Sequence, residues 1–544
     1  MTGTITPTYD GFGRTTNKVV SLQINSTNGF YNSISYDYHT GADGSESGLV
    51  SNYISKVGNT SSNTTQTQYW QYAYDENGNI TQIRDKVGYV YYNYTYDDLG
   101  QLIREDNRAQ GYSYTYTYDD SGNILSKKRY TFTTGTLGTA DRTYTYEYGD
   151  ATWGDLLTNF RGEDIEYDEI GNPIKIGYYD DSDEIWLYGY ELTWDGRELV
   201  SYRAFETIDE PVYGLTVEYT YNSDGIRTSK TVDGVEHLYY LNGEQIIAET
   251  WNKGSVEHML IYVYDETGAP IAIKYRSSTY AQDVYDVFFL EKNLQGDVVA
   301  VYNSSGTKIG SYTYDAWGSF TTTTDSSTAI DILMVVYYNP FRYRGYYYDT
   351  DTSLYYLQSR YYNHQWGRFI NADEHVSTGQ GLLGYNMFSY CNNNPIINVD
   401  SEGEFPWLVL AIVFVPAIIG AIIGATSDVD LTKTQESQVD ASCVDMSMGE
   451  EEDYESQSLT FGTRVKNTVL GFSLGLVVGG ALASTGGVVA GAAGMSFFGT
   501  SAAQTFAIGA LAYDFPAICI LPFYGVELEP IEYEPMSNTN LPQN

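Results

Sequence analysis

The chain has few basic residues: 29 Lys and Arg stand against 70 Asp and Glu, which gives a formal net charge of −41. Nucleic-acid phosphates repel a surface this acidic, and no stretch of the sequence gathers basic residues, so no nucleic-acid partner is expected. Prolines number only 13, while 42% of the residues are hydrophobic. Because that much apolar surface can offset the loss of chain entropy, most of the chain is expected to fold.

Cysteine and histidine are also scarce. The three cysteines, Cys391, Cys443 and Cys519, lie far apart and support neither a disulfide framework nor a zinc site, so each is expected to be a small buried or partly buried residue. The five histidines have no zinc-binding or catalytic-triad spacing, and no metal or cofactor is expected. The N-terminus has neither the basic nor the apolar part of a signal peptide, so export would need another route or a longer precursor.

Tyrosine, in contrast, supplies 56 residues, and many belong to a repeat. Residues 72–80, 94–102 and 116–124 read YAYDENGNI, YTYDDLGQL and YTYDDSGNI, which places their aspartates and glycines 22 residues apart. Looser copies occur from Tyr9 to Gly318. A fixed period of this length indicates a repeat architecture, which decides the fold class before any single element does.

Each repeat predicts a β-hairpin. Asp at the first and Gly at the fourth position favour a type I turn, in which the Asp side chain bonds the turn's own backbone. The residues before the turn alternate, so Tyr112, Tyr114, Tyr116 and Tyr118 share one strand face. Hairpins that bury little alone must pair with their neighbours, which predicts an all-β spiralling shell built from one long antiparallel sheet. A β-helix or a propeller remains the alternative.

At these residues the chain resembles the Rhs or YD-repeat family over roughly residues 1–404. The most specific stretches are the motifs Asn339–Asp349, Leu354–Tyr362, Gly367–Asp373 and Asn392–Asp400, the first two of which are rich in arginine and tyrosine. The resemblance implies a hollow YD-repeat shell over residues 1–335 and an Rhs-associated core over residues 336–404 that plugs it. In toxin members such a shell encloses a variable C-terminal effector.

The resemblance also implies a catalytic pair. In family members that cut themselves, two aspartates at the end of the core form an aspartyl autoprotease, and Asp373 and Asp400 match them here. Two carboxylates held close together cannot both ionise, so one can act as an acid and the other as a base. The chain departs from the family in having Glu374 and Ser401, rather than proline, after these aspartates. A purely structural core is therefore the alternative.

Four arginines of the same region are expected to neutralise buried or clustered acids rather than bind a ligand: Arg342, Arg344, Arg360 and Arg368.

The last part of the chain has a different composition. Residues 405–426 form an uncharged apolar run, and residues 468–513 form a second run rich in Gly and Ala. Their lengths predict transmembrane α-helices within residues 405–526, separated by an acidic loop at 427–467 and followed by a polar tail at 527–544. The few basic residues near the runs, Lys433, Arg464 and Lys466, place that loop in the cytoplasm and the shell outside the cell.

Three functions fit this sequence. The first is a secreted or cell-surface shell protein whose C-terminal segment contacts membrane lipid, as anchor, pore or enclosed cargo. The second is an adhesion module whose tyrosines bind a cell-surface glycan or protein. The third is a self-processing protein that performs one aspartyl autoproteolysis and is otherwise no enzyme.

Overall fold

The structure is a computed structural model. It describes residues 2–24, 29–41, 46–180, 182–183, 185–207, 211–281, 284–324, 335–376, 383–404, 407–408 and 437–440. The chain divides into two compact units, residues 1–497 and 498–544, and all described residues belong to the first.

A single antiparallel sheet of 27 strands dominates the first unit. Its first half is β1 (Thr2–Tyr9), β2 (Thr15–Gln23), β3 (Gly29–Thr40), β4 (Glu46–Gly58), β5 (Thr64–Tyr74), β6 (Ile80–Arg84), β7 (Val90–Tyr96), β8 (Leu102–Asn107), β9 (Tyr112–Tyr118), β10 (Ile124–Thr131), β11 (Arg142–Glu147), β12 (Asn159–Phe160) and β13 (Glu163–Tyr167). Its second half is β14 (Pro173–Asp180), β15 (Ile185–Asp195), β16 (Glu198–Thr207), β17 (Pro211–Tyr221), β18 (Arg227–Val232), β19 (Val235–Asn242), β20 (Gln245–Lys253), β21 (Val256–Tyr264), β22 (Pro270–Ser277), β23 (Asp286–Lys292), β24 (Val298–Tyr302), β25 (Lys308–Tyr314) and β26 (Phe320–Thr324), with β33 (Ser437–Asp440) paired to β1. The prediction of an all-β protein with one long antiparallel sheet is confirmed.

The repeat folds as the turn chemistry predicts. Strands β9 and β10 pair around residues 119–123, where the amide of Gly122 donates to the carbonyl oxygen of Asp119 over 3.1 Å. The Asp119 carboxylate accepts the amides of Ser121 and Asn123 at 2.9 and 2.8 Å. Gly122 has φ of +80°, so a type I turn followed by one left-handed residue closes the hairpin. The Asp-x-x-Gly signature therefore specifies both the turn and the residue type that can end it.

The tyrosine of the motif links consecutive hairpins. The Tyr96 hydroxyl donates to the carbonyl oxygen of Ile80 over 2.7 Å, and the Tyr118 hydroxyl donates to that of Leu102 over 2.6 Å. Both acceptors follow the preceding turn. The same contact recurs along the sheet: Tyr74 to Val50, Tyr148 to Ile124, Tyr221 to Leu199 and Tyr314 to Val298. The tyrosines thus cross-link the repeats as well as packing their faces, which the strand alternation alone does not reveal.

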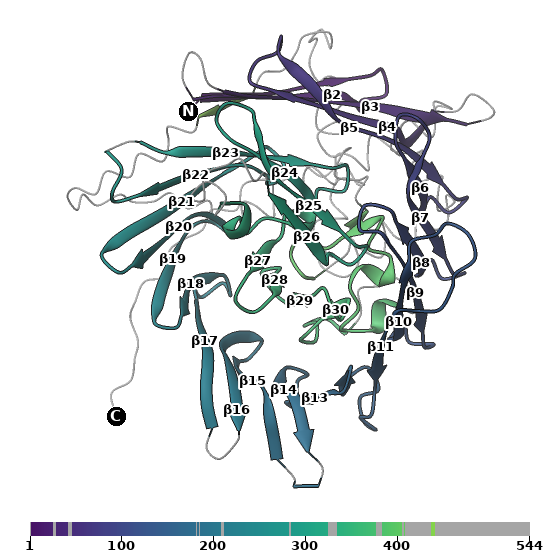
Figure 1. The fold of residues 1–544 in the computed structure, drawn as a ribbon, viewed down its shortest axis with the longest axis vertical. Coiled ribbons are helices and arrows are strands. Elements are labelled where there is room, and N and C mark those ends of the chain that lie inside the picture. The colour runs from purple at the N-terminus through teal and green to yellow at the C-terminus, as the bar shows by residue number, and fades with distance from the viewer. Residues whose placement is uncertain are drawn as a thin grey trace, which may run out of the picture. The chain divides into compact units, whose positions relative to one another are not determined.

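Later strands of the sheet pack against its first strands. The Lys18 ammonium on β2 lies 3.0 Å from the carboxylate of Asp265, in the turn after β21. The ring of Phe30 on β3 stacks on Phe289 of β23, with centroids 4.6 Å apart. Figure 1 shows β2 to β5 lying close to β23 and β24, while β6 to β17 curve around the remaining side. The sheet therefore curls back on itself so that its later strands pack against its earlier ones, which buries one of its faces.

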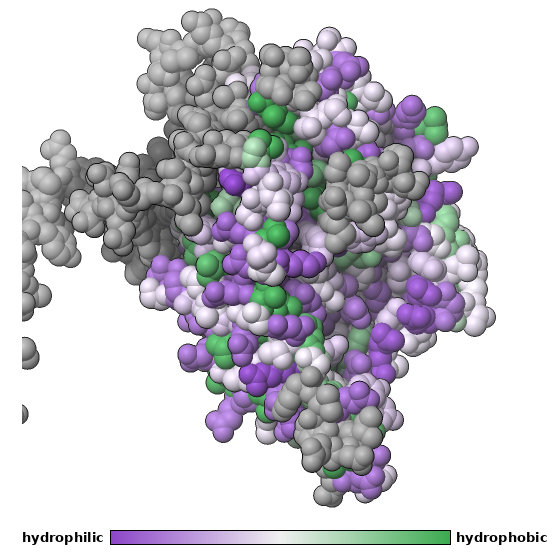
Figure 2. Space-filling model, turned by 60° about the vertical axis from the view of Figure 1, so that its left-hand side comes forward, coloured by the Kyte–Doolittle hydropathy of each residue, from purple (hydrophilic) through white to green (hydrophobic). Residues whose placement is uncertain are grey.

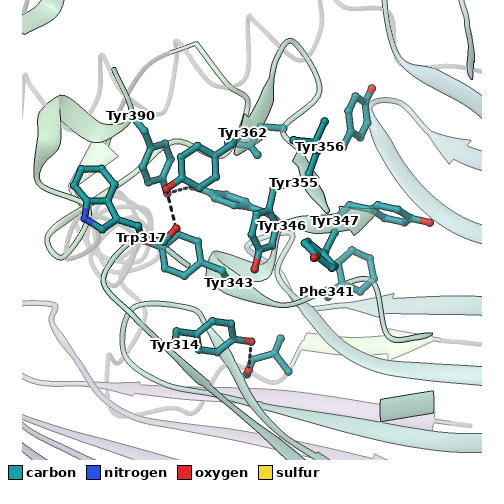
Figure 3. Packing of buried hydrophobic residues seen from close by; sticks show 14 of the residues in the cluster. Tyr314, Trp317, Phe341, Tyr343, Tyr346, Tyr347, Tyr355, Tyr356, Tyr362 and Tyr390 are labelled. Carbon is teal, nitrogen blue, oxygen red and sulfur yellow. Dashed lines mark hydrogen bonds between the residues drawn. The ribbon is translucent and has the colours of Figure 1, made fainter. Parts of the chain in front are cut away.

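The described residues 335–376 and 383–404 after the sheet, which we call the plug, lie within this curved wall (Figure 1). A small sheet of β27 (Tyr347–Asp349), β28 (Leu354–Tyr356), β29 (Tyr361–Asn363) and β30 (Arg368–Phe369) is its centre. Three short 3-10 turns flank it, η1 (Tyr343–Gly345), η2 (Leu383–Tyr385) and η3 (Cys391–Asn393), and β31 (Asn398–Val399) pairs with β32 (Trp407–Leu408) near its end. Figure 3 shows plug tyrosines packed ring against ring, including Tyr362 and Tyr390, whose centroids lie 4.1 Å apart. Cys391 is buried there, as expected.

The predicted membrane spans fall almost wholly outside the described residues. Within the apolar run of residues 405–426, the structure describes only Trp407–Leu408, which form an extended strand and not a helix. Residues 409–436 and 441–544 are not described. Among the described residues, no helix has both the length and the apolar character needed to cross a membrane. On the face seen in Figure 2, hydrophobic residues of the described part are scattered among hydrophilic ones.

Candidate functional site

The two aspartates that the sequence singles out meet at one arginine. Arg360 lies in the turn between β28 and β29 and is buried. Its Nη2 atom is 2.9 Å from Oδ2 of Asp373 and 3.4 Å from Oδ2 of Asp400. The guanidinium carbon also lies 3.6 Å from the ring centroid of Phe369. The plug therefore brings together residues from three separate segments around one buried cation.

The second oxygen of each carboxylate binds backbone amides. Oδ1 of Asp373 accepts the amide of His375 at 2.8 Å. Oδ1 of Asp400 accepts the amides of Gly403 and Glu404 at 2.8 and 3.1 Å. Amide donors of this kind fix the orientation of a carboxylate as well as satisfying it. Both aspartates are thus held in place independently of Arg360.

Burial decides the electrostatics of the cluster. Burial raises the pKa of Asp400, while the Arg360 guanidinium and the two amides oppose that rise. Burial likewise lowers the pKa of Arg360. It also raises the pKa of Glu404, to which the negative charges of Asp373 and Asp400 add. One buried cation therefore faces two buried carboxylates, Asp373 and Asp400, and burial of this kind favours a carboxyl group that retains its proton toward neutral pH.

The peptide bond between Gly403 and Glu404 lies against this cluster. Nε of Arg360 donates a hydrogen bond to the carbonyl oxygen of Gly403, and the amide of Glu404 donates to Asp400. Gly403 has φ of +78°, and a Cβ atom there would lie 2.7 Å from the Ser359 hydroxyl oxygen. Only glycine permits this approach. A cation at the carbonyl oxygen and a carboxyl group at the nitrogen are the groups that acid-assisted hydrolysis of an amide needs.

The arginine prediction is correct for two of the four residues. Arg360 binds the two aspartates, and Arg344 lies 3.2 Å from Asp297. Arg342 and Arg368 instead donate to uncharged groups, among them the carbonyl oxygen of Asn339 at 3.2 Å and that of Asp155 at 2.6 Å. The sequence does not show that Arg360 belongs to the aspartate pair, because the three residues lie in separate segments. The geometry joins Asp373 and Asp400, and their catalytic role stays a prediction.

Comparison with known proteins places the chain among repeat proteins. A family model described as RHS Repeat matches residues 96–136. The tRNA3(Ser)-specific nuclease WapA of Bacillus spizizenii is 32% identical over 256 residues, which are 47% of this chain and 10% of that protein. The tRNA nuclease WapA of Bacillus subtilis is 31% identical over the same shares of the two chains. The chain thus spans about one tenth of the length of these relatives.

Two solved structures share the fold. A crystal structure of TcdB2-TccC3-TEV matches with a TM-score of 0.52 at 20% identity, over 73% of this chain and 20% of that one. The Photorhabdus luminescens Tc holotoxin pore matches with a TM-score of 0.54 at 18% identity, over 80% of this chain and 21% of that one.

Proposed function

We propose that this chain, an RHS-repeat protein, is the shell of a secreted or cell-surface toxin system and releases its own C-terminal segment by a single self-cleavage. The observation that carries the proposal is the placement of one peptide bond, Gly403–Glu404, between Arg360 and Asp400. This bond lies where the plug ends. A cut there separates the shell and plug from residues 404–544.

The chemistry follows from the contacts. Asp373 accepts a proton from a water molecule, whose oxygen attacks the carbonyl carbon of Gly403. Arg360 stabilises the negative charge that develops on the carbonyl oxygen. Asp400, whose Oδ1 accepts the Glu404 amide in the structure, takes up a proton before the reaction and donates it to the nitrogen of Glu404 as the C–N bond breaks and that nitrogen gains a lone pair. The products are a carboxylate at Gly403 and an amine at Glu404, so one water molecule is consumed and no cofactor takes part.

The inner wall supports enclosure of an apolar segment. Tyr178 and Tyr188 stack with centroids 5.8 Å apart, and their side chains are 45% and 51% exposed. Tyr178 shares its sheet face with Ile176, which packs in the central core. Exposed rings on the core-facing side of the sheet offer contacts to the uncharged run of residues 405–426. After release, that run and the one at 468–513 insert into a membrane, which is how we propose the segment acts.

WapA is named for a nuclease activity, but the stretch that matches this chain is only 10% of that protein. Residues 405–544 carry no nuclease motif, which favours action on a lipid membrane over action on tRNA.

The mass of the purified protein tests the cut. Wild type should give two polypeptides, residues 1–403 and 404–544, and Asp400→Asn should give one of 544 residues. Asp351→Asn is the matched control, because Asp351 is another ion-paired plug aspartate, 3.0 Å from Lys230. It should cleave like wild type. A single intact chain in wild type refutes the self-cleavage.

Adhesion is the second candidate, favoured by the same exposed pair, because exposed tyrosine rings can also stack on sugar rings. Binding of the shell to immobilised glycans, lost in Tyr188→Ala, would support it.

A further inference from the structure

Three turns of the shell wall, one from each of three consecutive repeats, present one side-chain oxygen each toward the plug. In the turn at Asp97, the carboxylate accepts both the backbone amide and the side-chain amide of Gln101, at 2.8 and 2.9 Å. That pairing leaves the side-chain oxygen of Gln101 pointing away from its own turn. Asn79 and Asn123 occupy the same position in the turns before and after, 22 residues away on either side, and bond their aspartates at 2.9 and 3.0 Å. The repeat thus produces a row of equivalent acceptors.

Asn394 of the plug bridges the first two turns of this row. Its Nδ2 atom donates to Oδ1 of Asn79 over 2.8 Å and to the carbonyl oxygen of Gly100 over 2.9 Å. Asn394 and Asn79 are both buried. One primary amide therefore uses both of its hydrogens, one on each repeat.

Asn393 bridges the second and third turns in the same way. Its Nδ2 atom donates to Oε1 of Gln101 over 2.9 Å and to the carbonyl oxygen of Gly122 over 2.6 Å. Asn386 adds a bond to Oδ1 of Asn123 over 2.8 Å. Adjacent plug residues thus bind turns that are one repeat apart. Shifting the plug by one repeat along the wall would leave one of these asparagines without its turn.

The plug backbone is strained where it makes these contacts. Cys391, Asn392 and Asn393 have φ of 53°, 50° and 59°, a left-handed run of three residues that are not glycine. Such a run is unfavourable in an isolated chain and persists only where surrounding contacts hold it. The bonds to the wall supply that constraint, so the turn is expected to form on the completed wall and not before it.

The strained turn leads directly to the candidate cleavage site. The amide of Asn398 donates to the carbonyl oxygen of Asn394 over 3.2 Å, and Asp400 follows two residues later. The Tyr390 hydroxyl, just before the turn, lies 2.9 Å from the Tyr346 hydroxyl, which accepts the amide of Asp400 at 2.9 Å. Both ends of the turn therefore fix the position of Asp400.

We propose that Asn393 and Asn394 are positioning residues that bind three consecutive repeats and thereby couple completion of the shell wall to the placement of Asp400. The docking part of this proposal stands on the contacts alone, and its consequence for cleavage rests on the proposed function. A wall that lacks one of these turns, or carries it out of register, leaves the aspartate pair unassembled and its cargo uncut.

Hydrogen exchange tests the docking without relying on cleavage. Asn394→Ala removes both wall contacts at a position whose φ is negative, −125°, so the substitution puts no alanine into the left-handed region. We expect amide exchange in residues 395–403 to accelerate at least tenfold, with strands β14 to β17 unchanged. Asn32→Ala is the matched control, because Asn32 is a buried asparagine whose amide oxygen accepts the Ser55 hydroxyl within the wall. It should leave exchange in residues 395–403 at the wild-type rate.

A second pair of variants acts from the wall side. Gly88 and Gly122 have φ of +88° and +80°, but an added Cβ meets nothing within 4 Å at Gly88, whereas at Gly122 it would lie 2.6 Å from Cδ2 of Leu383 and 3.1 Å from Nδ2 of Asn393, both in the plug. Gly122→Val should therefore accelerate exchange in residues 395–403. Gly88→Val, the matched control, strains a turn that binds no plug residue and should change that exchange at least tenfold less.

The two proposals fail separately. Wild-type exchange in Asn394→Ala and Gly122→Val overturns the docking proposal even if wild type cleaves. Accelerated exchange in a protein that never cleaves supports docking and overturns the proposed function. If both hold, Asn394→Ala also reduces the yield of the 1–403 fragment at least tenfold, while Asn32→Ala does not.

Discussion

Replacing Asp349 with asparagine should loosen the plug from the wall. Asp349 on β27 and Arg227 on β18 are both fully buried, with guanidinium nitrogens 2.5 and 3.2 Å from the carboxylate oxygens. Lys230 lies 3.2 Å from the same carboxylate. The substitution leaves two buried positive charges facing a neutral amide. Removing one partner of a buried ion pair costs about 3–5 kcal/mol of unfolding free energy.

The aromatic surroundings of Arg227 place the expected loss near the lower end of that range. Four tyrosine rings lie with centroids 4.3–5.1 Å from its guanidinium carbon: Tyr219, Tyr239, Tyr347 and Tyr356. Cation–π contacts of this kind keep part of the charge stabilised when the carboxylate is lost. We therefore expect Asp349→Asn to lower the unfolding free energy by about 3 kcal/mol.

Urea unfolding followed by tryptophan fluorescence measures this loss. Glu218→Gln is the control, because the Glu218–Arg203 pair spans 3.1 Å with side chains 53% and 43% exposed. Exposed pairs contribute about 0–1 kcal/mol. If Asp349→Asn loses no more than Glu218→Gln, the buried pair does not hold the plug and the reasoning fails. Asp349→Leu combined with Arg227→Leu should recover part of the loss, since no buried charge is then left unpaired.

Three further predictions concern the turns and the pH dependence of stability. Gly100→Val should lower the free energy of unfolding by about 1 kcal/mol or more, because Gly100 has a positive φ. Gly122→Val should lower it further, because Gly122 also abuts the plug. Thermal unfolding measures both losses. Burial lowers the pKa of His364 to about 4, so between pH about 6.5 and 4 this histidine binds a proton in the unfolded chain but not in the folded one. The free energy of unfolding should therefore fall as the pH drops through this range. His364→Gln should remove this part of the pH dependence of the urea midpoint. Burial alone would raise the pKa of Asp265, but neighbouring lysines hold that pKa well below its usual value. The ionised carboxylate therefore stabilises the fold above pH about 4, and this stabilisation is lost as the pH falls further. Lys18→Met should lower the free energy of unfolding at pH 7, and the variant should lose less of that free energy than wild type on acidification to pH 2.

The hairpin unit was predictable because its information is local. Asp119 and Gly122 specify one turn within four residues, and the alternation from Tyr112 to Tyr118 specifies one strand. The packing of later strands against the first strands could not be predicted, because Lys18 and Asp265 are 247 residues apart and no sequence pattern marks them as partners. The division of the chain at residues 336 and 404 stays a prediction.

The candidate site was predictable only in part. Resemblance to a family pointed to Asp373 and Asp400, and the structure places both at one guanidinium. Arg360 was expected to neutralise acids, but its contact with the carbonyl oxygen of Gly403 depends on the plug's folded path. Asparagine tolerates the left-handed conformation better than most residues, but the sequence does not mark that Asn393 adopts it, because contacts with the wall hold it there.

The hydroxyl contacts of the repeat tyrosines give the wall a direction of assembly. Tyr96 bonds Ile80 and Tyr118 bonds Leu102, and in each case the acceptor lies earlier in the chain. Each hairpin therefore donates a hydrogen bond to a carbonyl group of the preceding hairpin. Its own equivalent carbonyl group is bonded only when the next hairpin has formed. A chain that emerges from the ribosome, or from an export channel, with its N-terminus first can thus fold one hairpin at a time onto a finished template. The last strands and the plug arrive when the wall that must receive them already exists.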